Sequence, residues 1–301
     1  MVEHYFRVSK NEEDNHFNRK RKSLLSIWLS NLSVTGWLIL VNVIFFIVFS
    51  LLGVLSEVDC SKTLCNYVAL QPNNLFNNYY FWTLLTSMFM HSGIFHLFIN
   101  MLSLFFVGSF LEMIIGKKRF LWLYLLSGIF AGIFFSILAV LFGNGVLGHS
   151  LFGGIDTFAV GASGAIFAIA GVLCFLTPKN SVYLIVGPII AIVIQFALTN
   201  FISSGTMSLV NILVNIYIFI SIFSMFSINS NFRKISLPIK MPFWLLPLVA
   251  IIPLFIIGFF FELPIGNTAH LGGFIAGAIY GIYLRLKYKK KTQMISHYFS
   301  K

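Results

Sequence analysis

The stretch Val160-Gly161-Ala162-Ser163-Gly164-Ala165 opens an apolar run that continues to Leu176. The run is long enough for most of a membrane-spanning helix. The glycines beside Ser163 keep bulky side chains away from its hydroxyl and let other backbones come close. At the start of a helix, free N–H groups and the positive dipole end stabilise a developing oxyanion. The stretch therefore predicts either a nucleophilic serine or a helix–helix contact, because small residues are also usual at membrane helix interfaces.

The composition indicates a membrane protein. Of the 301 residues, 58% are hydrophobic and only 10% are charged, and the mean hydropathy is +0.90. These values exclude an ordinary soluble domain, and the short alternating segments of a membrane β-barrel are absent from the sequence. The net charge of +11 lies in short clusters between apolar runs, as is typical of cytoplasmic loops. We therefore expect no nucleic-acid partner.

Hydropathy predicts an all-α, polytopic membrane bundle of about eight spans. The expected spans are residues 36–55, 86–113, 120–142, 158–176, 182–201, 207–226, 241–261 and 267–286, with a glycine-rich loop at 143–157. Residues 1–35 are expected to form a cytoplasmic and interfacial segment. Residues 36–286 form the expected membrane domain, and residues 287–301 a basic cytoplasmic tail.

The basic residues predict the orientation of the bundle. With the N-terminus inside, 19 of the 20 Lys and Arg residues lie on the cytoplasmic side, and only Lys62 faces out. Both termini are then cytoplasmic, in an integral protein that we expect in a prokaryotic plasma membrane. The polar residues expected together near the outer side are Ser163, His270, His91, His96 and Asn100.

His270 is the natural base for Ser163. A serine hydroxyl needs a base to remove its proton, and the pKa of histidine is suited to that task. The row Gly273-x3-Gly277-x3-Gly281 predicts a flat helix face that lets the two helices approach. No carboxylate is well placed to orient the imidazole, so we expect a Ser–His dyad rather than a triad. The alternative is an interfacial histidine near the membrane boundary.

His96 and Asn100 are four residues apart and so share one helix face. Together with the Ser163 N–H, they can donate hydrogen bonds to an oxyanion. A helix-contact hydrogen bond is the alternative for Asn100. Phe167, one turn after Ser163, predicts either stacking on the imidazole or ordinary apolar contact. We expect no metal site, because no carboxylate or thiolate lies at the depth of the three histidines.

The cysteines leave two interpretations open. Cys60 and Cys65 lie in one polar loop, where they form either a small disulfide or two free thiols. Cys174 lies within an apolar run.

Taken together, His91…His96-x3-Asn100, Gly161-Ala162-Ser163-Gly164 and Ala269-His270-x2-Gly273 resemble the motifs of the rhomboid intramembrane serine proteases. The resemblance implies a nucleophilic Ser163, a general base His270, and an oxyanion hole of His96, Asn100 and the Ser163 N–H. It implies cleavage of transmembrane segments of other membrane proteins near the outer leaflet, without a cofactor. Supporting roles are implied for Gly161, Gly164, Phe167, His91 and Gly273.

The sequence departs from the family pattern in two places. The family's Trp-Arg pair in the first outer loop is here Trp82-Thr83, so that loop must be held differently. In addition, four apolar runs follow Leu176 where the six-span family core has two. We infer that residues 182–226 are an inserted two-helix hairpin. Because the hairpin adds two crossings, Ser163 and His270 stay on the same side of the membrane.

The expected function is that of a serine endopeptidase acting on transmembrane protein substrates within the lipid bilayer. A rhomboid-like pseudoprotease that binds membrane helices without cutting them is the main alternative. A transporter is a third, but the spans carry few of the charged residues that transporters use. The sequence leaves the oligomeric state and the substrate open.

Overall fold

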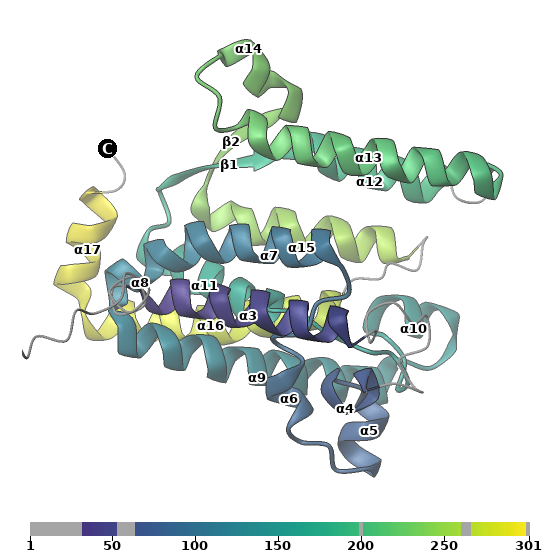
Figure 1. Cartoon of the computed structure of the whole chain (residues 1–301). Helices are drawn as coiled ribbons and strands as arrows, with labels where there is room; N and C mark the ends of the chain where they lie inside the picture. The colour runs from purple at the N-terminus through teal and green to yellow at the C-terminus, as the bar shows by residue number, and fades with distance from the viewer. Residues whose placement is uncertain (1–31, 53–63, 199–200, 260–265, 299–301) are drawn as a thin grey trace, which may run out of the picture.

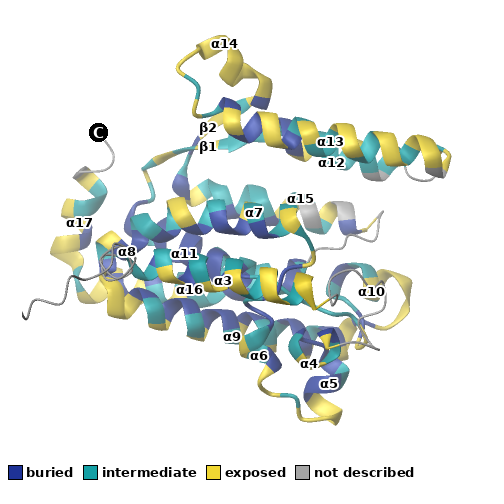
Figure 2. Cartoon of the chain, viewed as in Figure 1, coloured by how far each residue is buried: buried dark blue, intermediate teal, exposed yellow. Residues whose placement is uncertain are grey.

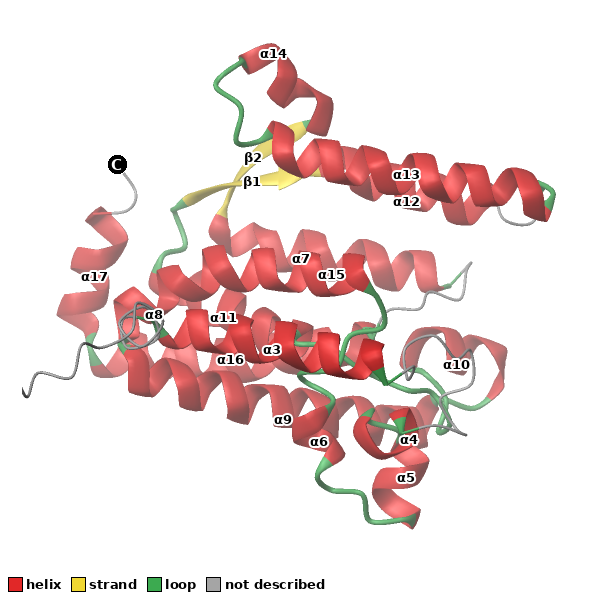
Figure 3. Cartoon of the chain, in the orientation of Figure 1, coloured by secondary structure: helices red, strands yellow, loops and turns green. Residues whose placement is uncertain are grey.

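A computed structural model describes residues 32–52, 64–198, 201–259 and 266–298 of the chain. Helices make up nearly all of its regular structure, and the described strands form one small two-stranded sheet (Figure 3). The all-α class is therefore confirmed. Residues 1–31 of the expected N-terminal segment, and Cys60 with its neighbours, lie outside the described residues.

The elements follow one another along the chain as shown in Figure 1. The first half contains α3 (Val34–Leu51), α4 (Cys65–Val68), α5 (Pro72–Asn77), α6 (Thr83–Thr86), α7 (Ile94–Ser103), the π-helical turn η2 (Leu104–Gly108), α8 (Ser109–Ile115), α9 (Lys117–Phe142), α10 (Gly145–Phe152) and α11 (Ser163–Leu176). The second half contains β1 (Ser181–Ile185), α12 (Val186–Leu198), α13 (Ser204–Ser224), α14 (Ser230–Arg233), η3 (Lys234–Ser236), β2 (Pro238–Pro242), η4 (Phe243–Leu245), α15 (Leu246–Gly258), α16 (Asn267–Lys287) and α17 (Lys289–Tyr298).

Among the described residues, four helical segments are long and apolar enough to cross a membrane. They are Val34–Leu51, Ile94–Ile115, Lys117–Phe142 and Gly205–Ser224. Shorter apolar helices occupy Ser163–Leu176, Val186–Gln195 and Phe243–Pro253. Many large apolar side chains on these helices are exposed, which would be unfavourable in water and is favourable in lipid. The chain is an integral membrane protein.

Helix α11 is the most deeply buried helix of the site region and packs against both α9 and α16, which also touch each other. Most of its residues are buried, from Gly164 to Leu176, whereas α13 and α14 are largely exposed (Figure 2). Its contact with α16 is made backbone to backbone. A methyl group added at Gly273 would overlap the carbonyl oxygen of Gly164, and one added at Gly277 would overlap that of Ala168. The expected glycine face of α16 is therefore the surface that meets α11.

Several of the predicted element boundaries are wrong. Helix α11 begins at Ser163 rather than at Phe158, and the run expected to be helical from Met241 begins with the end of β2 and the 3-10 turn η4. The second span does not begin at Thr86, because turns separate α6 from α7, whose helix starts only at Ile94. The expected glycine-rich loop at 143–157 contains the helix α10. The run expected to be helical from Val182 begins with the strand β1. At Val182 the apolar run continues through the boundary, and pairing with β2, distant in sequence, makes the segment a strand. At 143–157 the glycines predict a loop, but a short local helix still forms between them.

The loop region before α7 packs against the glycine face of α9. A methyl group at Gly132 would lie 3.0 Å from Leu70 and 3.2 Å from Leu84, and one at Gly128 would overlap Met88. Gly128-x3-Gly132 therefore accommodates loop side chains as well as a neighbouring helix. Within this loop Cys65 is buried and disulfide-bonded.

The missing arginine of the Trp-Arg pair is replaced by other hydrogen bonds. Trp82 Nε1 donates to the carbonyl of Tyr67 at 2.7 Å, and Thr86 Oγ1 donates to that of Val68 at 2.8 Å. The rings of Tyr67, Tyr80 and Trp82 stack in sequence, with centroid separations of 5.5 and 4.8 Å. Aromatic stacking and donors to backbone oxygens therefore hold this loop without a guanidinium.

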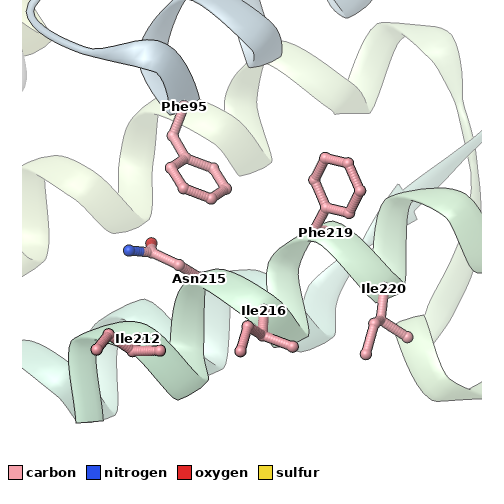
Figure 4. Close-up of a pocket in the computed structure, with 6 residues that line it drawn as sticks. All are labelled: Phe95, Ile212, Asn215, Ile216, Phe219 and Ile220. Atoms are coloured by element: carbon pink, nitrogen blue, oxygen red, sulfur yellow. The ribbon is translucent and has the colours of Figure 1, made fainter. Parts of the chain in front are cut away.

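Helices α12 and α13 stand side by side at one edge of the bundle (Figure 1). The antiparallel strands β1 and β2 lie at their base, so the chain leaves and returns at nearly the same point; Ile185 is paired with Pro238. Stacked and tilted rings join α13 to the bundle, with Phe98 5.7 Å from Phe219. Beside this contact lies an apolar pocket of about 350 Å³, lined by Phe95 of α7 and by Ile212, Asn215, Ile216, Phe219 and Ile220 of α13 (Figure 4).

Candidate active site

Ser163 is the first residue of α11, at the N-terminal end that stabilises negative charge. The backbone turns sharply just before it: Gly161 has φ of +119°, a conformation that L side chains rarely adopt. The Gly161 N–H donates to the carbonyl of Ser87 at 2.8 Å, which fixes the loop to the segment before α7. A rigid turn therefore places the serine hydroxyl at the start of the helix.

His270 lies in the first turn of α16, directly opposite Ser163. Its Nε2 and the Ser163 Oγ are 2.8 Å apart, within hydrogen-bonding distance. The two residues are 107 positions apart in sequence. The close α11–α16 contact brings them together, because glycine at position 273 lets the two backbones touch. A serine bonded to a histidine in this way is the arrangement that nucleophilic catalysis requires.

Phe167 stacks on one face of the His270 imidazole. The two ring centroids lie 4.4 Å apart at an interplanar angle of 19°, which is a stacked arrangement. Among the described residues, the His270 Nδ1 is buried and has no hydrogen-bond partner. No carboxylate therefore orients this ring there, and stacking together with the Ser163 hydroxyl sets its position.

His96 and Asn100 converge on the backbone just before the serine. A methyl group added at Gly161 would lie 2.9 Å from Cε1 and Nε2 of His96 and 3.5 Å from Nδ2 of Asn100. The Asn100 Nδ2 is buried and has no hydrogen-bond partner among the described residues. A buried amide donor without an acceptor is costly, and it is suited to receive an oxyanion that forms only during reaction.

His91 and Ser92 both contact the ring of His96. His91 lies before α7 rather than within it; it is buried, and its ring meets that of His96 edge-on at 5.0 Å. Ser92 Oγ lies 3.1 Å from His96 Nδ1. Sequence reasoning overlooked Ser92, although it stands four residues before His96 in the same way that His96 precedes Asn100. Ser92 fixes the ring so that Nε2 faces Gly161.

Gly164 and Gly273 allow neighbouring helices to approach closely. A methyl group at Gly164 would lie 2.8 Å from the Ala131 side chain of α9, and Gly273 meets the Gly164 carbonyl. The structure therefore brings Ser163, His270, Phe167, His96, Asn100 and Gly161 into one cluster at the meeting point of α7, α11 and α16.

Comparison with known proteins identifies the bundle. The family model described as "Rhomboid domain" matches residues 78–221 and 217–287, which together cover more than two thirds of the 301-residue chain. The chain belongs to the rhomboid family. The matched region holds all of the cluster, from His91 to Gly273.

Several named relatives share this rhomboid region. The chain is 36% identical to RHOMBOID-like protein 1 of Arabidopsis thaliana over 113 residues, which is 38% of the chain and 25% of that protein. It is 37% identical to the putative rhomboid protease YdcA of Bacillus subtilis over 95 residues, which is 32% of the chain and 41% of that protein. It is 34% identical to inactive RHOMBOID-like protein 8 of Arabidopsis thaliana over 120 residues, 40% of the chain and 30% of that protein. Each alignment thus spans less than half of the relative's own length.

Of these relatives, one is named as a putative protease and one as inactive. The rhomboid family therefore supports two roles in the membrane, intramembrane proteolysis and a rhomboid-like role without cleavage. The choice between them depends on the side chains of this chain.

Proposed function

We propose that this rhomboid is an intramembrane serine endopeptidase with a dyad of Ser163 and His270. The observation that carries the proposal is the 2.8 Å contact between the Ser163 Oγ and the His270 Nε2. A protein that only binds helices has no need for this hydrogen bond. Nor does it need a buried Asn100 amide without an acceptor beside it.

The residues divide the reaction between them. The Ser163 Oγ attacks the carbonyl carbon of the scissile peptide bond while His270 takes the hydroxyl proton. The carbonyl oxygen becomes an oxyanion, which accepts hydrogen bonds from the Ser163 N–H, the Asn100 amide and His96. His270 then gives its proton to the leaving amine, and the C–N bond breaks. Water attacks the acyl-enzyme, again through His270, and restores the Ser163 hydroxyl.

The substrates we propose are transmembrane segments of other membrane proteins. Helical hydrogen bonding protects peptide bonds in a membrane, so the segment must unwind where Ser163 can reach it. The distribution of Lys and Arg supports cytoplasmic termini and a site that opens toward the outer side, where water is available. Chemistry of this type needs no cofactor. We place the protein in the plasma membrane of a prokaryote and leave its oligomeric state open.

We also propose that the α12–α13 pair is an insertion in the six-span core. The pairing of β1 with β2 supports this proposal, because Ile185 and Pro238 are neighbours across the sheet while the hairpin lies between them in sequence. Residues 36–286 then form one membrane domain that this hairpin interrupts, and residues 287–301 are a cytoplasmic tail.

A fluorophosphonate probe tests the proposal directly. The full chain in detergent micelles should be labelled at Ser163, and the Ser163→Ala variant should not. The His270→Ala variant should lose labelling too, although its nucleophile is intact, because the base is gone. Liposomes that hold the chain together with a tagged single-span protein should yield a shed fragment only with the wild type.

The rival role is that of a rhomboid-like protein that binds helices without cleavage, which the relative named as inactive brings into consideration. It predicts no labelling and no shed fragment from a wild-type chain that is folded by its thermal unfolding curve. It also predicts that Ser163→Ala retains a bound single-span protein as well as the wild type does. That set of results would replace the protease proposal.

A further inference from the structure

A cluster of cations and tyrosines lies far from Ser163 in sequence, where α9 begins and α16 ends. Arg119 Nη2 donates to the Tyr288 hydroxyl at 3.3 Å, and its Cζ lies 5.4 Å from the centre of the Tyr288 ring. Lys287 Nζ donates to the Tyr283 hydroxyl, 2.6 Å away. It also lies 5.1 Å from the centre of the Tyr283 ring and 5.8 Å from that of Tyr288. Two cations therefore share one aromatic ring, Tyr288.

No described carboxylate neutralises this cluster. Within residues 32–52, 64–198, 201–259 and 266–298 the acidic residues are Glu112 and Asp156. Glu112 is buried and accepts three hydrogen bonds from the start of α3. Asp156 accepts a hydrogen bond from Asn73 of α5. Exposed cations also flank the cluster in sequence, namely Lys117, Lys118, Arg285, Lys289, Lys290 and Lys291. Like charges held this close repel one another, and an anion would offset the repulsion.

The cluster lies at one end of a helix that is long and apolar enough to cross a membrane. Arg119 lies in the first turn of the 26-residue apolar helix α9. One turn further into α9, Trp122 is 55% exposed, and Leu286, next to Lys287, is 75% exposed. Tyrosine and tryptophan at such a boundary are typical of residues at lipid headgroup level. A ligand here therefore meets cations and hydroxyls at one end and exposed apolar side chains at the other.

We propose that Arg119, Lys287, Tyr283 and Tyr288 bind the headgroup phosphate of an anionic phospholipid. The guanidinium of Arg119 matches the geometry of two phosphate oxygens, and the Lys287 ammonium adds a point charge. The acyl chains lie along Trp122 and Leu286. Basic pockets beside membrane helices are suited to headgroups of this class. The site is remote from the proposed dyad and does not depend on its being active.

The test uses the full chain, carrying Ser163→Ala to prevent self-cleavage, purified in a neutral detergent. Native mass spectrometry counts retained lipid while phosphatidylglycerol or phosphatidylcholine is titrated, and thermal unfolding is followed in parallel. We expect retention of phosphatidylglycerol, with a rise in the unfolding temperature, and much weaker retention of phosphatidylcholine. Each cation near a headgroup contributes about fivefold, so Arg119→Gln with Lys287→Gln should weaken phosphatidylglycerol binding about 25-fold.

Two controls keep the result specific. Lys179→Gln removes an exposed cation outside the cluster, at the end of α11, and should leave binding unchanged. Arg119→Lys keeps the charge and should bind more tightly than Arg119→Gln, even if the double variant unfolds. Equal retention of both lipids, or equal loss of binding in Lys179→Gln, would overturn the proposal. So would inorganic phosphate raising the unfolding temperature as much as the phospholipid does, because that result indicates a site for free anions.

Discussion

At Gly273, the absence of a methyl group decides whether α11 and α16 can touch. A Cβ there would overlap the Gly164 carbonyl oxygen one residue after Ser163. That contact also brings the Ser163 hydroxyl within 2.8 Å of the His270 ring. Gly273 therefore makes the Ser163–His270 hydrogen bond possible without taking part in it, because its missing side chain lets α11 and α16 approach each other.

Gly273→Ala should therefore separate the two helices. We expect the free energy of unfolding to fall by about 1–3 kcal/mol, as for an overpacked core, and fluorophosphonate labelling of Ser163 to decrease strongly. Gly205→Ala is the matched control, because nothing lies within 4 Å of a Cβ at Gly205. It should leave both the unfolding curve and the labelling unchanged. Equal behaviour of the two variants would contradict this account of Gly273.

Asn100 contributes a different effect, because its buried Nδ2 has no acceptor among the described residues in the resting site. Asn100→Ala should lower kcat about 10²–10³-fold with little change in KM, since the hydrogen bond forms only as the oxyanion develops. Steady-state cleavage of a single-span reporter measures both constants. A rise in KM at constant kcat would instead indicate that Asn100 binds the substrate.

At the scale of a whole element, Glu112 attaches α3 to α8. Its carboxylate accepts hydrogen bonds from Val34 N at 2.9 Å, from Thr35 N at 2.8 Å and from Thr35 Oγ1 at 2.6 Å. These are donors at the N-terminal end of α3, where a negative charge is most favourable. The start of the membrane-spanning helix α3 is therefore tied to α8 by one buried carboxylate, in addition to the apolar packing of side chains such as Leu38.

Glu112→Gln should weaken this attachment. The amide keeps one acceptor oxygen but turns an NH₂ toward donors, so we expect a loss of about 2 kcal/mol in the free energy of unfolding. Asp156→Asn makes the same chemical change at an exposed carboxylate with one side-chain hydrogen bond, and should cost far less. Chemical or thermal unfolding in micelles compares the two. A similar loss in both variants would argue against the capping role of Glu112.

For the molecule as a whole, the site is built on the contact of α11 with α9 and α16, whereas α12 and α13 lie at the edge (Figure 1). The hairpin touches the core through rings such as Phe98 and Phe219 and leaves an apolar pocket beside Phe95 (Figure 4). The proposed catalytic residues make none of these contacts. Folding of the site should therefore be separable from the hairpin.

Removing residues 186–237 and joining Ile185 to Pro238 through Asn-Gly should leave a folded rhomboid core. The two residues are already paired, and Asn-Gly favours the tight turn that such strands require. We expect Ser163 to be labelled at a rate similar to that of the full chain. A matched chain with the same deletion and Ser163→Ala provides the background. A folded deletion chain that is not labelled would mean that the hairpin is part of the site.

Much of this arrangement was predictable, because the lipid environment allows a membrane protein only a few kinds of structure. Hydropathy indicated the helices, since every backbone group in lipid must be paired within a helix or a closed barrel. Glycine spacing indicated the face of α16 that meets α11. The resemblance of three short motifs predicted the family. Prediction from the sequence failed at the ends of helices, as at Ile94 and Val182. At these positions the apolar residues continue, but the hydrogen-bond partners of the backbone change.

The sequence by itself determined that this chain enters the membrane, which stretches are apolar enough to do so, and which polar residues are chemically suited to react. Only the tertiary structure decided that Ser163 meets His270, that His91 lies before the helix rather than in it, and that Ser92 supports His96. Composition and periodicity can be seen in short stretches of sequence, and the preference of a stretch for lipid or water depends on that stretch alone. The distance between two side chains 107 residues apart depends on how whole helices pack, which local sequence does not specify.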